Sequence, residues 1–295
     1  MELGFILVNL GASNVVVSTS IIIPTFNGAD WIGIQLESLS KQAGIDSCEV
    51  VVSDNGSTDQ TLQVARSFEH TLNIVVVDAT ERKGNAAARN IGAAGSAGDL
   101  MIFVDQDDET QIGWLEAIRE SAEIYELVWG NIPLAWDWDR RATLAVTGTA
   151  IQYGTANFLP YGLSSNMAIR RSALHDLGGF DEKFESATDL DLAWRASIAG
   201  TTVGFCDEAV VLKRPKTSGG FGQHRSFGRD DVLLYARFRS DGMPGAVKAT
   251  VRRYGWLIRH IPRLFDHSIQ RTWVRLAGRS VGRLEGSLKN RVFYP

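Results

Sequence analysis

The segment Ser20-Ile-Ile-Ile-Pro-Thr-Phe-Asn27 opens the stretch that decides the fold, because the pattern it begins recurs as far as Val104. Four short runs rich in β-branched residues predict strands, and three amphipathic segments of helical length lie between them. The predicted strands are Ile21 to Pro24, Glu49 to Ser53, Asn73 to Val77 and Leu100 to Val104, and the predicted helices cover Trp31 to Gln42, Asp59 to Phe68 and Asn85 to Ala97. Strands that alternate with helices indicate an α/β fold with a mostly parallel sheet and helices on both faces.

Polar residues follow these strands at their carboxyl ends, where open α/β sheets bind ligands. Asn27 follows the first strand, Asp54 ends the second, and Phe103-Val-Asp-Gln-Asp-Asp108 brings three carboxylates to the end of the fourth. Alternation along an extended chain would point Asp105 and Asp107 to the same side, where they could hold a divalent cation and its bound phosphates. A solvated acidic turn is the alternative.

Two further segments place charged residues at the start of predicted helices. Lys83-Gly-Asn-Ala-Ala-Ala-Arg-Asn90 could bind an anion, with Arg89 reaching a phosphate or base, or it is an ordinary helix with a solvated arginine. Further along, Thr188 and Asp191 have the spacing of a capping box. Asp189 then has no capping duty and is a candidate base.

Charge is distributed unevenly along the chain. Residues 241–295 hold eleven Lys and Arg against three acidic residues, a balance of +8, whereas residues 1–240 carry −12, because the whole chain carries −4. Arginines spaced by three or four residues, with apolar residues between them, predict amphipathic helices in this tail. Two interpretations stay open: docking on the rest of the chain or on a dimer partner, and contact with a membrane surface. No motif supports nucleic-acid binding, and the acidic remainder argues against it.

The composition predicts a cytoplasmic protein, with peripheral contact at the inner face of the membrane as an addition. No apolar run approaches the roughly 18 residues that a membrane span needs. The first twenty residues lack the basic start of a secretory signal, and Leu3 to Ser18 is predicted to form an extra edge strand or a frayed extension. Cys48 and Cys206 lie in apolar, strand-like runs, which predicts buried thiols and no disulfide framework or thiolate metal site.

Seven segments together resemble family 2 glycosyltransferases of the GT-A fold in order and spacing, over about residues 18 to 212. They are Ile21-Ile-Ile-Pro-Thr-Phe-Asn27, Val52-Ser-Asp-Asn-Gly-Ser-Thr-Asp59, Gly84 to Asn90, Phe103 to Asp108, Ser165-Asn-Met-Ala-Ile-Arg170, Gly178-Gly-Phe-Asp-Glu182 and Asp189-Leu-Asp-Leu-Ala-Trp-Arg195. The resemblance implies a GT-A type α/β fold with a Rossmann-like nucleotide-binding half and a helical C-terminal extension. It divides the chain into an N-terminal extension (1–18), a glycosyltransferase domain (19–240) and a basic helical region (241–295).

The resemblance also implies a reaction, the inverting transfer of a sugar from a nucleoside diphosphate to an acceptor hydroxyl without a covalent intermediate. Its implied donor-site residues are Pro24, Thr25 and Asn27 for the nucleoside pocket, Asp54 for the base, Arg89 for base or phosphate, Asp105 for the ribose side, and Asn166. Asp107 would carry Mg²⁺ or Mn²⁺, and Asp189 would deprotonate the acceptor hydroxyl. His224, beside the Gly-rich stretch 218–223 that is predicted to be flexible, would add a metal contact or is an exposed loop histidine.

The substrates stay open at this point. The donor nucleotide could be UDP, dTDP or GDP, and a pyrimidine is favoured because Asp54 suits its N3–H. The acceptor could be a glycan, a glycolipid or a small molecule, as in polysaccharide or glycosylated natural-product biosynthesis.

Three alternatives to a glycosyltransferase have weaker support in the sequence. The family commonly has Glu-Asp where this chain has Thr188-Asp189, which leaves room for a catalytically silent nucleotide-sugar binding module. A haloacid-dehalogenase-type phosphatase also uses Asp-x-Asp, but normally after its first strand and not its fourth. A Rossmann dehydrogenase fails because no Gly-x-Gly-x-x-Gly follows the first strand.

Overall fold

The computed structural model describes residues 7–10, 13–16, 18–133, 135–137, 142–145, 152–153, 158–214 and 220–294. Its internal contacts divide the chain into two compact units. The first unit comprises Met1–Gln152, Tyr161–Asp181 and Leu192–Pro215, and the second comprises Tyr153–Pro160, Glu182–Asp191 and Lys216–Pro295. The predicted boundary between residues 240 and 241 stays a prediction.

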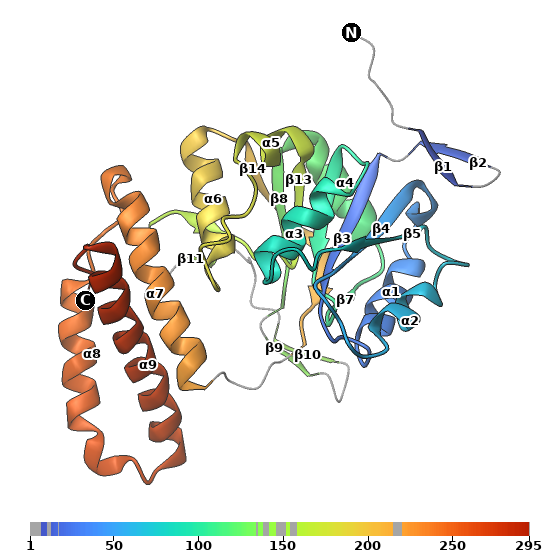
Figure 1. Cartoon of the computed structure of the whole chain (residues 1–295). Helices are drawn as coiled ribbons and strands as arrows, with labels where there is room; N and C mark the ends of the chain where they lie inside the picture. Colours follow the sequence, from blue (N-terminus) through green and yellow to red (C-terminus); the bar gives the residue numbers. More distant parts are fainter. Residues whose placement is uncertain are drawn as a thin grey trace. The chain divides into compact units, whose positions relative to one another are not determined.

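An eight-stranded sheet forms the centre of the first unit (Figure 1). Its strands, in spatial order, are β5 (Ile74–Asp78), β4 (Cys48–Asp54), β3 (Thr19–Thr25), β6 (Leu100–Val104), β13 (Asn166–Arg170), β8 (Leu127–Asn131), β14 (Val203–Leu212) and β7 (Glu109–Thr110). The first four run parallel, as predicted. The sheet becomes mixed beyond them, because β13 is antiparallel to both β6 and β8 while β14 is parallel to β8.

Short antiparallel pairs lie outside this sheet. β1 (Leu7–Leu10) pairs with β2 (Ser13–Val16), β9 (Ala135–Asp137) with β10 (Ala142–Ala145), and β11 (Gln152–Tyr153) shares a small sheet with β12 (Pro160–Tyr161). The described residues of the N-terminal extension, 7–10 and 13–16, therefore pair with each other in a sheet of their own and not with the main sheet.

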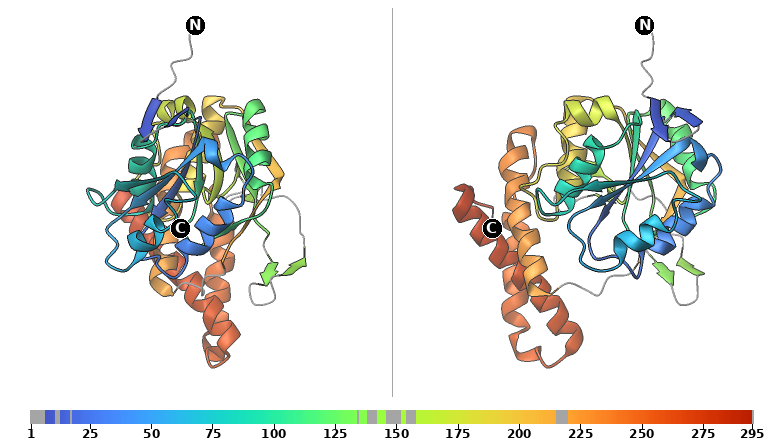
Figure 2. Two further views of the ribbon diagram at one scale, coloured as in Figure 1. Left: turned by 90° about the vertical axis from the view of Figure 1, so that its right-hand side faces the viewer. Right: turned by 45° about the vertical axis from the view of Figure 1, so that its right-hand side comes forward.

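Helices cover both faces of the main sheet, as the alternating pattern predicted (Figure 2). On one face, α1 (Ile32–Ser40), α2 (Thr61–Arg66) and α4 (Trp114–Ile124) bury a cluster that includes Ile21 and Ile23 of β3. On the other face, α3 (Asn85–Ala94) approaches so closely that a Cβ at Gly92 would lie 2.8 Å from Ile22. Successive side chains of β3 thus pack against the helices on opposite faces of the sheet. The carboxyl end of the strand therefore lies between the two helical layers.

The second unit is built mainly of α7 (Phe221–Phe238), α8 (Val247–Arg259) and α9 (His267–Asn290), so the predicted helical tail is confirmed. Short 3₁₀ helices cover Ile45–Ser47, Arg239–Asp241 and Ile261–Arg263, and α5 (Arg171–Asp176) and α6 (Thr188–Ala199) complete the helices of the chain's described part. The sequence did not predict α7. Of the stretch 218–223 that was expected to be flexible, the described residues from Phe221 onward are helical.

Glycines allow α7 and α9 to touch through their backbones. A Cβ at Gly228 of α7 would collide with the Arg279 carbonyl oxygen, and one at Gly282 of α9 would collide with that of Arg225. Because two backbones approach this closely only where side chains are small, the residues at these positions determine the distance between the helices.

A buried carboxylate fixes the same pair of helices. Asp231 of α7 accepts two hydrogen bonds from Arg279, both 2.6 Å long, and one of 2.7 Å from Arg283, both residues of α9. Burial alone would raise the pKa of Asp231, but the two guanidinium groups outweigh it and hold the pKa below its ordinary value. The ionised carboxylate therefore contributes to the stability of the second unit.

Replacing this carboxylate tests the contribution. Asp231→Asn should lower the free energy of unfolding by about 3–5 kcal/mol at neutral pH, because two largely buried cations lose their counter-charge. Because the pKa of Asp231 is lower in the folded than in the unfolded chain, its stabilising free energy is fully present above the unfolded pKa and disappears as the pH falls through the folded pKa. The difference in stability between Asp231→Asn and wild type should therefore shrink on acidification. Urea unfolding at several pH values measures it, with Glu285→Gln in an exposed pair as the control. An equal loss of unfolding free energy in Asp231→Asn and Glu285→Gln would contradict the stabilising role of Asp231.

Candidate functional site

The loops that follow β3 and β4 are tied together by hydrogen bonds. Asn27, in a left-handed conformation with φ 45°, accepts the Thr58 N–H at 2.8 Å, and its own N–H donates to Ser57 Oγ at 3.0 Å. Both carboxylate oxygens of Asp54 lie 3.2 Å from the Ser57 N–H. Asp54, the residue assigned to the base, therefore also has a structural contact within its own loop.

The end of β3 presents few side chains to solvent. Pro24 and Thr25 are buried, and Thr25 Oγ1 donates to the Ile23 carbonyl at 3.0 Å. The next two residues, Phe26 and Asn27, are exposed. Gln106 braces Phe26, accepting its N–H at 3.1 Å and donating to its carbonyl at 3.0 Å. Of the three residues assigned to the nucleoside pocket, Asn27 is therefore the one with an accessible side chain.

Four charged side chains gather where β6 and β14 end. Asp105 accepts a 2.9 Å bond from Arg89 of α3 and another of 2.9 Å from the Lys213 ammonium. Lys213 also donates to Asp108 at 3.2 Å and to Ser165 Oγ at 2.9 Å. Arg89 and Asp108 are almost fully buried. This cluster brings together residues from three predicted motifs and one residue, Lys213, that the sequence did not single out.

The chain does not stay extended through the acidic segment. It turns at Gln106 and Asp107, so the extended-strand reasoning that placed Asp105 and Asp107 on one side was wrong. The side chain that shares Lys213 with Asp105 is Asp108. The pattern Asp-x-Asp-Asp could not reveal this, because its spacing is compatible with both conformations.

Electrostatics in this cluster are strongly coupled. Burial, followed by repulsion from Asp105, raises the pKa of Asp108 to about 7, although Lys213 opposes the rise. Burial would lower the pKa of Lys213, but the carboxylates of Asp105 and Asp108 outweigh it and raise that pKa above its ordinary value. Lys213 therefore stays protonated and neutralises part of the acidic cluster.

The carboxylates suit a hard divalent cation. Among the described residues no three His, Cys, Asp or Glu side chains gather as a complete ligand set. Mg²⁺ does not need one, because it is usually held by one or two carboxylates together with substrate phosphates and water. Asp107 is partly exposed beside Asp108, whose buried Oδ1 has no hydrogen-bond partner within the described part of the chain. The donor set fits Mg²⁺ or Mn²⁺ bound together with a diphosphate.

Two other predicted motifs also meet in the first unit. Asn90 donates to the Phe180 carbonyl at 2.8 Å and accepts the Phe180 N–H at 2.9 Å, while the Arg89 guanidinium lies 5.5 Å from the Phe180 ring centre. Arg195 donates to the Gly179 carbonyl at 2.8 Å, next to this contact. The Ala-Arg-Asn, Gly-Gly-Phe and Trp-Arg segments are thus parts of one assembly that orients Arg89.

Asn166 has a structural role, which corrects its assignment to the donor site. It is fully buried, and Trp114 Nε1 donates to its Oδ1 at 2.9 Å. Its amide nitrogen donates to the carbonyls of Asn131 at 3.1 Å and Ala209 at 2.8 Å. Because each polar atom of the amide is already bonded, Asn166 joins β13 to β8 and β14 and is not available to a ligand.

The region of Asp189 lies in the second unit. The helix α6 begins at Thr188, and the capping box of Thr188 and Asp191 stays a prediction. Asp191 is fully buried and pairs with Arg237 of α7. Asp189, by contrast, is partly exposed in the first turn.

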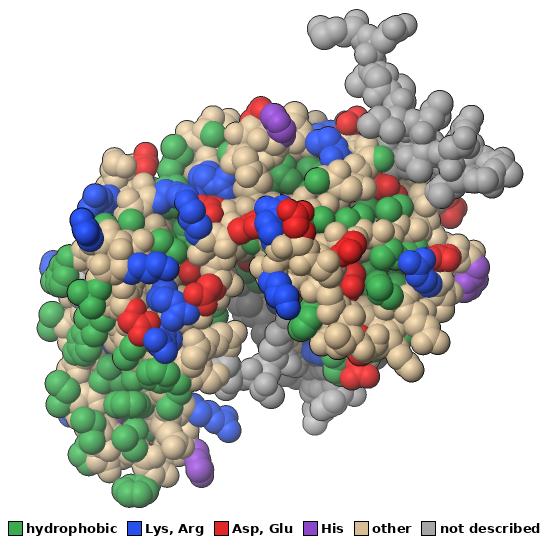
Figure 3. Space-filling model, in the orientation of Figure 1, with side chains coloured by type: hydrophobic (Ala, Val, Ile, Leu, Met, Phe, Trp, Pro, Cys, Tyr) green, Lys and Arg blue, Asp and Glu red, His purple; other side chains and the backbone are tan. Residues whose placement is uncertain are grey.

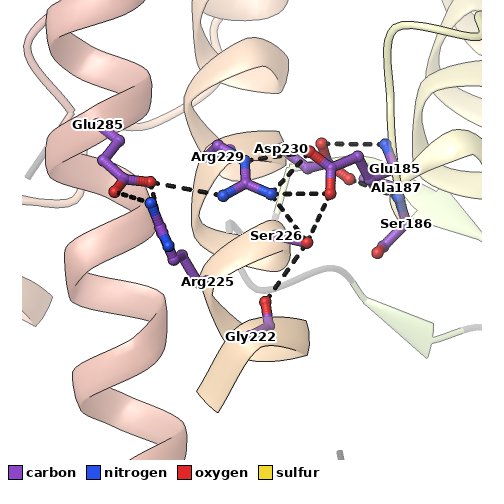
Figure 4. A network of polar contacts seen from close by, with 9 residues as sticks. All are labelled: Glu185, Ser186, Ala187, Gly222, Arg225, Ser226, Arg229, Asp230 and Glu285. Atoms are coloured by element: carbon purple, nitrogen blue, oxygen red, sulfur yellow. Dashed lines mark hydrogen bonds and ion pairs between the residues drawn. The ribbon is translucent and has the colours of Figure 1, made fainter. Parts of the chain in front are cut away.

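A polar network from α7 holds the loop that leads into α6 (Figure 4). The Asp230 carboxylate accepts the N–H groups of Glu185, Ser186 and Ala187 at 3.3, 2.6 and 3.0 Å. Arg229 clasps the Glu185 carboxylate with bonds of 2.8 to 3.1 Å. The backbone just before Asp189 is therefore fixed from outside its own helix, a contact that the sequence could not show because 43 or more residues separate the partners.

His224 lies in the first turns of α7, not in a loop, with its ring 5.6 Å from that of Phe227. It lines a small pocket together with Arg271 and Arg275 of α9. Two arginines beside the ring disfavour a cation there, and metal binding by His224 stays a prediction.

Comparison with known proteins gives one family and several relatives. The profile of "Glycosyl transferase family 2" matches residues 20–178. The pre-mycofactocin glycosyltransferase of Mycobacterium tuberculosis is 28% identical over 242 residues, or 78% of this chain and 47% of that one. Glycosyltransferase AglE of Haloferax volcanii is 28% identical over 65% of each chain. This chain thus spans about half to two thirds of the length of these relatives.

Solved structures show the same fold. The mannosyltransferase PcManGT from Pyrobaculum calidifontis, in complex with GDP-Man and Mn²⁺, superposes with a TM-score of 0.65 at 19% identity, covering 92% of this chain and 87% of that one. TarS 1–349 of S. aureus in complex with UDP-GlcNAc gives 0.57 at 18%, covering 95% and 93%. The predicted GT-A type α/β fold is confirmed.

The charge cluster can be tested without a ligand. Lys213→Met should lower the free energy of unfolding by about 3 kcal/mol at pH 8, because removing one partner of a buried ion pair leaves uncompensated charge. Adding Asp108→Asn should restore most of the loss, since a neutral amide needs no ammonium. Urea unfolding of wild type, the two single variants and the double variant gives the coupling free energy between Lys213 and Asp108. A double variant no more stable than Lys213→Met would contradict the pairing.

Proposed function

Because the chain belongs to glycosyl transferase family 2, we propose that it transfers a sugar from a nucleoside-diphosphate donor to an acceptor hydroxyl. The observation that supports this best is the cluster at the carboxyl edge of the sheet. There Arg89 and Lys213 hold Asp105 and Asp108 on either side of the partly exposed Asp107. Fixed cations beside carboxylates suit a diphosphate that arrives with a divalent cation.

The donor is proposed to lie across the loops after β3 and β4. Asn27 and Asp54 shape that edge, and a carboxylate retains acceptor capacity for a base N–H after it has bonded to a backbone amide. This favours uridine or thymidine, whose N3–H is a single donor, over guanosine. The fold relatives bind UDP-GlcNAc in one case and GDP-Man in another, so the nucleobase of this chain's donor is a proposal.

Asp107 is proposed to hold Mg²⁺ or Mn²⁺. When bound, the ion would neutralise negative charge on the departing diphosphate. Asp105 would keep Arg89 oriented toward the same phosphates or the ribose, since it accepts from Arg89 and Lys213 together. Lys213 would keep the carboxylates of Asp105 and Asp108 in place before the donor arrives.

Asp189 is proposed as the base of a direct, inverting displacement. Its carboxylate would accept the proton of the acceptor hydroxyl while that oxygen forms its bond to the anomeric carbon and the bond to the diphosphate breaks. Asp189 lies in the first turn of α6 and is partly exposed. The Asp230 network supports this role by holding residues 185–187 immediately before the helix.

Membership of the family excludes the phosphatase alternative. A silent nucleotide-sugar binding module stays open, and turnover of the donor distinguishes it from an enzyme. Cys48 and Cys206 are free and buried, as predicted, and the cytoplasmic location inferred partly from them remains a prediction.

Asp107→Asn should abolish transfer and remove Mn²⁺-dependent binding of nucleoside diphosphate, because an amide is a poor ligand for a hard cation. Titration calorimetry with UDP and Mn²⁺ measures the binding directly. Asp46→Asn, an exposed aspartate before β4, is the matched control and should behave as wild type. Turnover that is unchanged in EDTA would contradict the metal role.

Asp189→Asn should reduce turnover about 10²- to 10⁴-fold, the usual range for a general base, because the amide keeps the shape of the side chain but cannot accept the proton. Donor affinity should change little, since the proposed donor contacts come from other residues. Steady-state kinetics and donor titration measure the two effects, and Asp176→Asn, exposed at the end of α5, is the control. A near wild-type rate, or loss of donor binding, would rule out Asp189 as the base.

A further inference from the structure

Helix α8 of the second unit has three distinct faces. Successive residues of an α-helix lie about 100° apart, so positions three, four, seven and eleven residues apart share a face. One face packs inward: Thr250 and Leu257 are buried, and the Leu257 carbonyl accepts a 3.1 Å hydrogen bond from Trp273 Nε1 of α9. The remaining two faces are turned to solvent.

The first solvent-exposed face is apolar. Val247, Val251 and Ile258 share it, and they are 56%, 67% and 69% exposed. The apolar surface continues past the end of the helix, where Ile261 is 53% exposed and Phe265 is 97% exposed. Hydrophobic side chains gather over the α8–α9 hairpin at the lower left of Figure 3. Side chains this exposed contribute nothing to the core of the unit.

The second exposed face is basic. Lys248, Arg252 and Arg259 lie about 100° around the helix from the apolar face, and all three are exposed. From Gly242 to Phe265 the sequence contains five Lys and Arg and no Asp or Glu. The apolar stripe is therefore bordered by cations that have no acidic partner within their own segment.

We propose that this exposed face of α8, extended by Ile261 and Phe265, docks on a membrane surface that carries anionic lipid headgroups. A helix whose apolar stripe adjoins Lys and Arg lies in the plane of a bilayer interface, with the stripe in the acyl boundary and the cations at the headgroups. Within the described residues every helix is too short or too polar to cross a bilayer. The inference does not depend on the activity proposed above.

Charge complementarity favours a lipid surface over a second copy of the chain. In a twofold dimer centred on this stripe, the same patch of both copies would meet. Lys248, Arg252 and Arg259 of each copy would then surround one interface with no carboxylate from residues 242–265 to offset them. Anionic headgroups supply the opposite charge, and the cations would strengthen the contact instead of opposing it.

Vesicle binding by the full chain tests the proposal. Co-sedimentation with phosphatidylcholine vesicles that contain phosphatidylglycerol should be strong and should weaken with added salt, whereas phosphatidylcholine alone should bind little. Arg252→Gln with Arg259→Gln should weaken partitioning about 30-fold, because each cation near an anionic surface contributes about 1 kcal/mol. Val251→Ser with Ile258→Ser should weaken it about tenfold or more through lost apolar contact.

Ile124→Ser on α4 is the matched control, since that isoleucine is 72% exposed in the first unit and should leave vesicle binding unchanged. Thermal melts confirm that each variant is folded, and all the substituted side chains are exposed. The proposal is overturned if the wild-type protein does not bind anionic vesicles or binds neutral vesicles equally well. It is overturned as well if the arginine double variant and the Val251/Ile258 double variant both bind anionic vesicles as tightly as wild type. A further contradicting result is that the wild-type protein is a dimer in analytical ultracentrifugation, that Val251→Ser with Ile258→Ser converts it to a monomer, and that this variant still binds vesicles.

Discussion

The ammonium of Lys213, held between Asp105 and Asp108, is the interaction on which the acidic cluster at the carboxyl edge of the sheet depends. Three carboxylates within four residues would repel one another at the end of a buried strand. The cation comes from the end of β14, the strand that joins β8 from a distant part of the chain. Sheet topology thus provides the charge that lets an acidic cluster exist there, and Arg89 of α3 completes the neutralisation from the other side. The arrangement leaves a polar, preorganised edge that suits a metal-bound diphosphate.

A second constraint operates in the helical unit. Two carboxylates on neighbouring positions of α7 face different partners: Asp231 bonds to Arg279 and Arg283 of α9, and Asp230 bonds to the backbone N–H groups of residues 185–187. One helix therefore both anchors the basic hairpin and shapes the loop before Asp189. Arg279 and Arg283 of α9 are used in this contact, whereas Lys248, Arg252 and Arg259 of α8 are exposed to solvent. The helical unit thus has arginines that hold its helices together and, on α8, cations that are exposed to solvent.

The sequence predicted the part of the fold in which local periodicity decides the structure. Between Ser20 and Val104, the four parallel strands lie where the β-branched runs predicted them, and the three helices lie where the amphipathic stretches predicted them.

Site residues were harder to predict because their partners are distant in the sequence. Asn166 looks like a ligand-binding residue at a strand end, yet Trp114, Asn131 and Ala209 occupy it. Lys213 is a single cation after a strand, a signal too common to notice until the pairing of β14 with β8 places it beside Asp105. The helix α7 was missed because its first residues are Gly-rich and polar.

The central claim is that the carboxyl edge of the sheet binds a nucleotide sugar together with a divalent cation. Titration calorimetry of the full chain with UDP-, dTDP- and GDP-sugars, each with and without Mn²⁺, tests it most directly. The account predicts that at least one nucleotide sugar binds, that Mn²⁺ is required for tight binding, and that a pyrimidine nucleotide is preferred. Absence of binding by every nucleotide sugar in the presence of Mn²⁺, or equal binding in its absence, would contradict it.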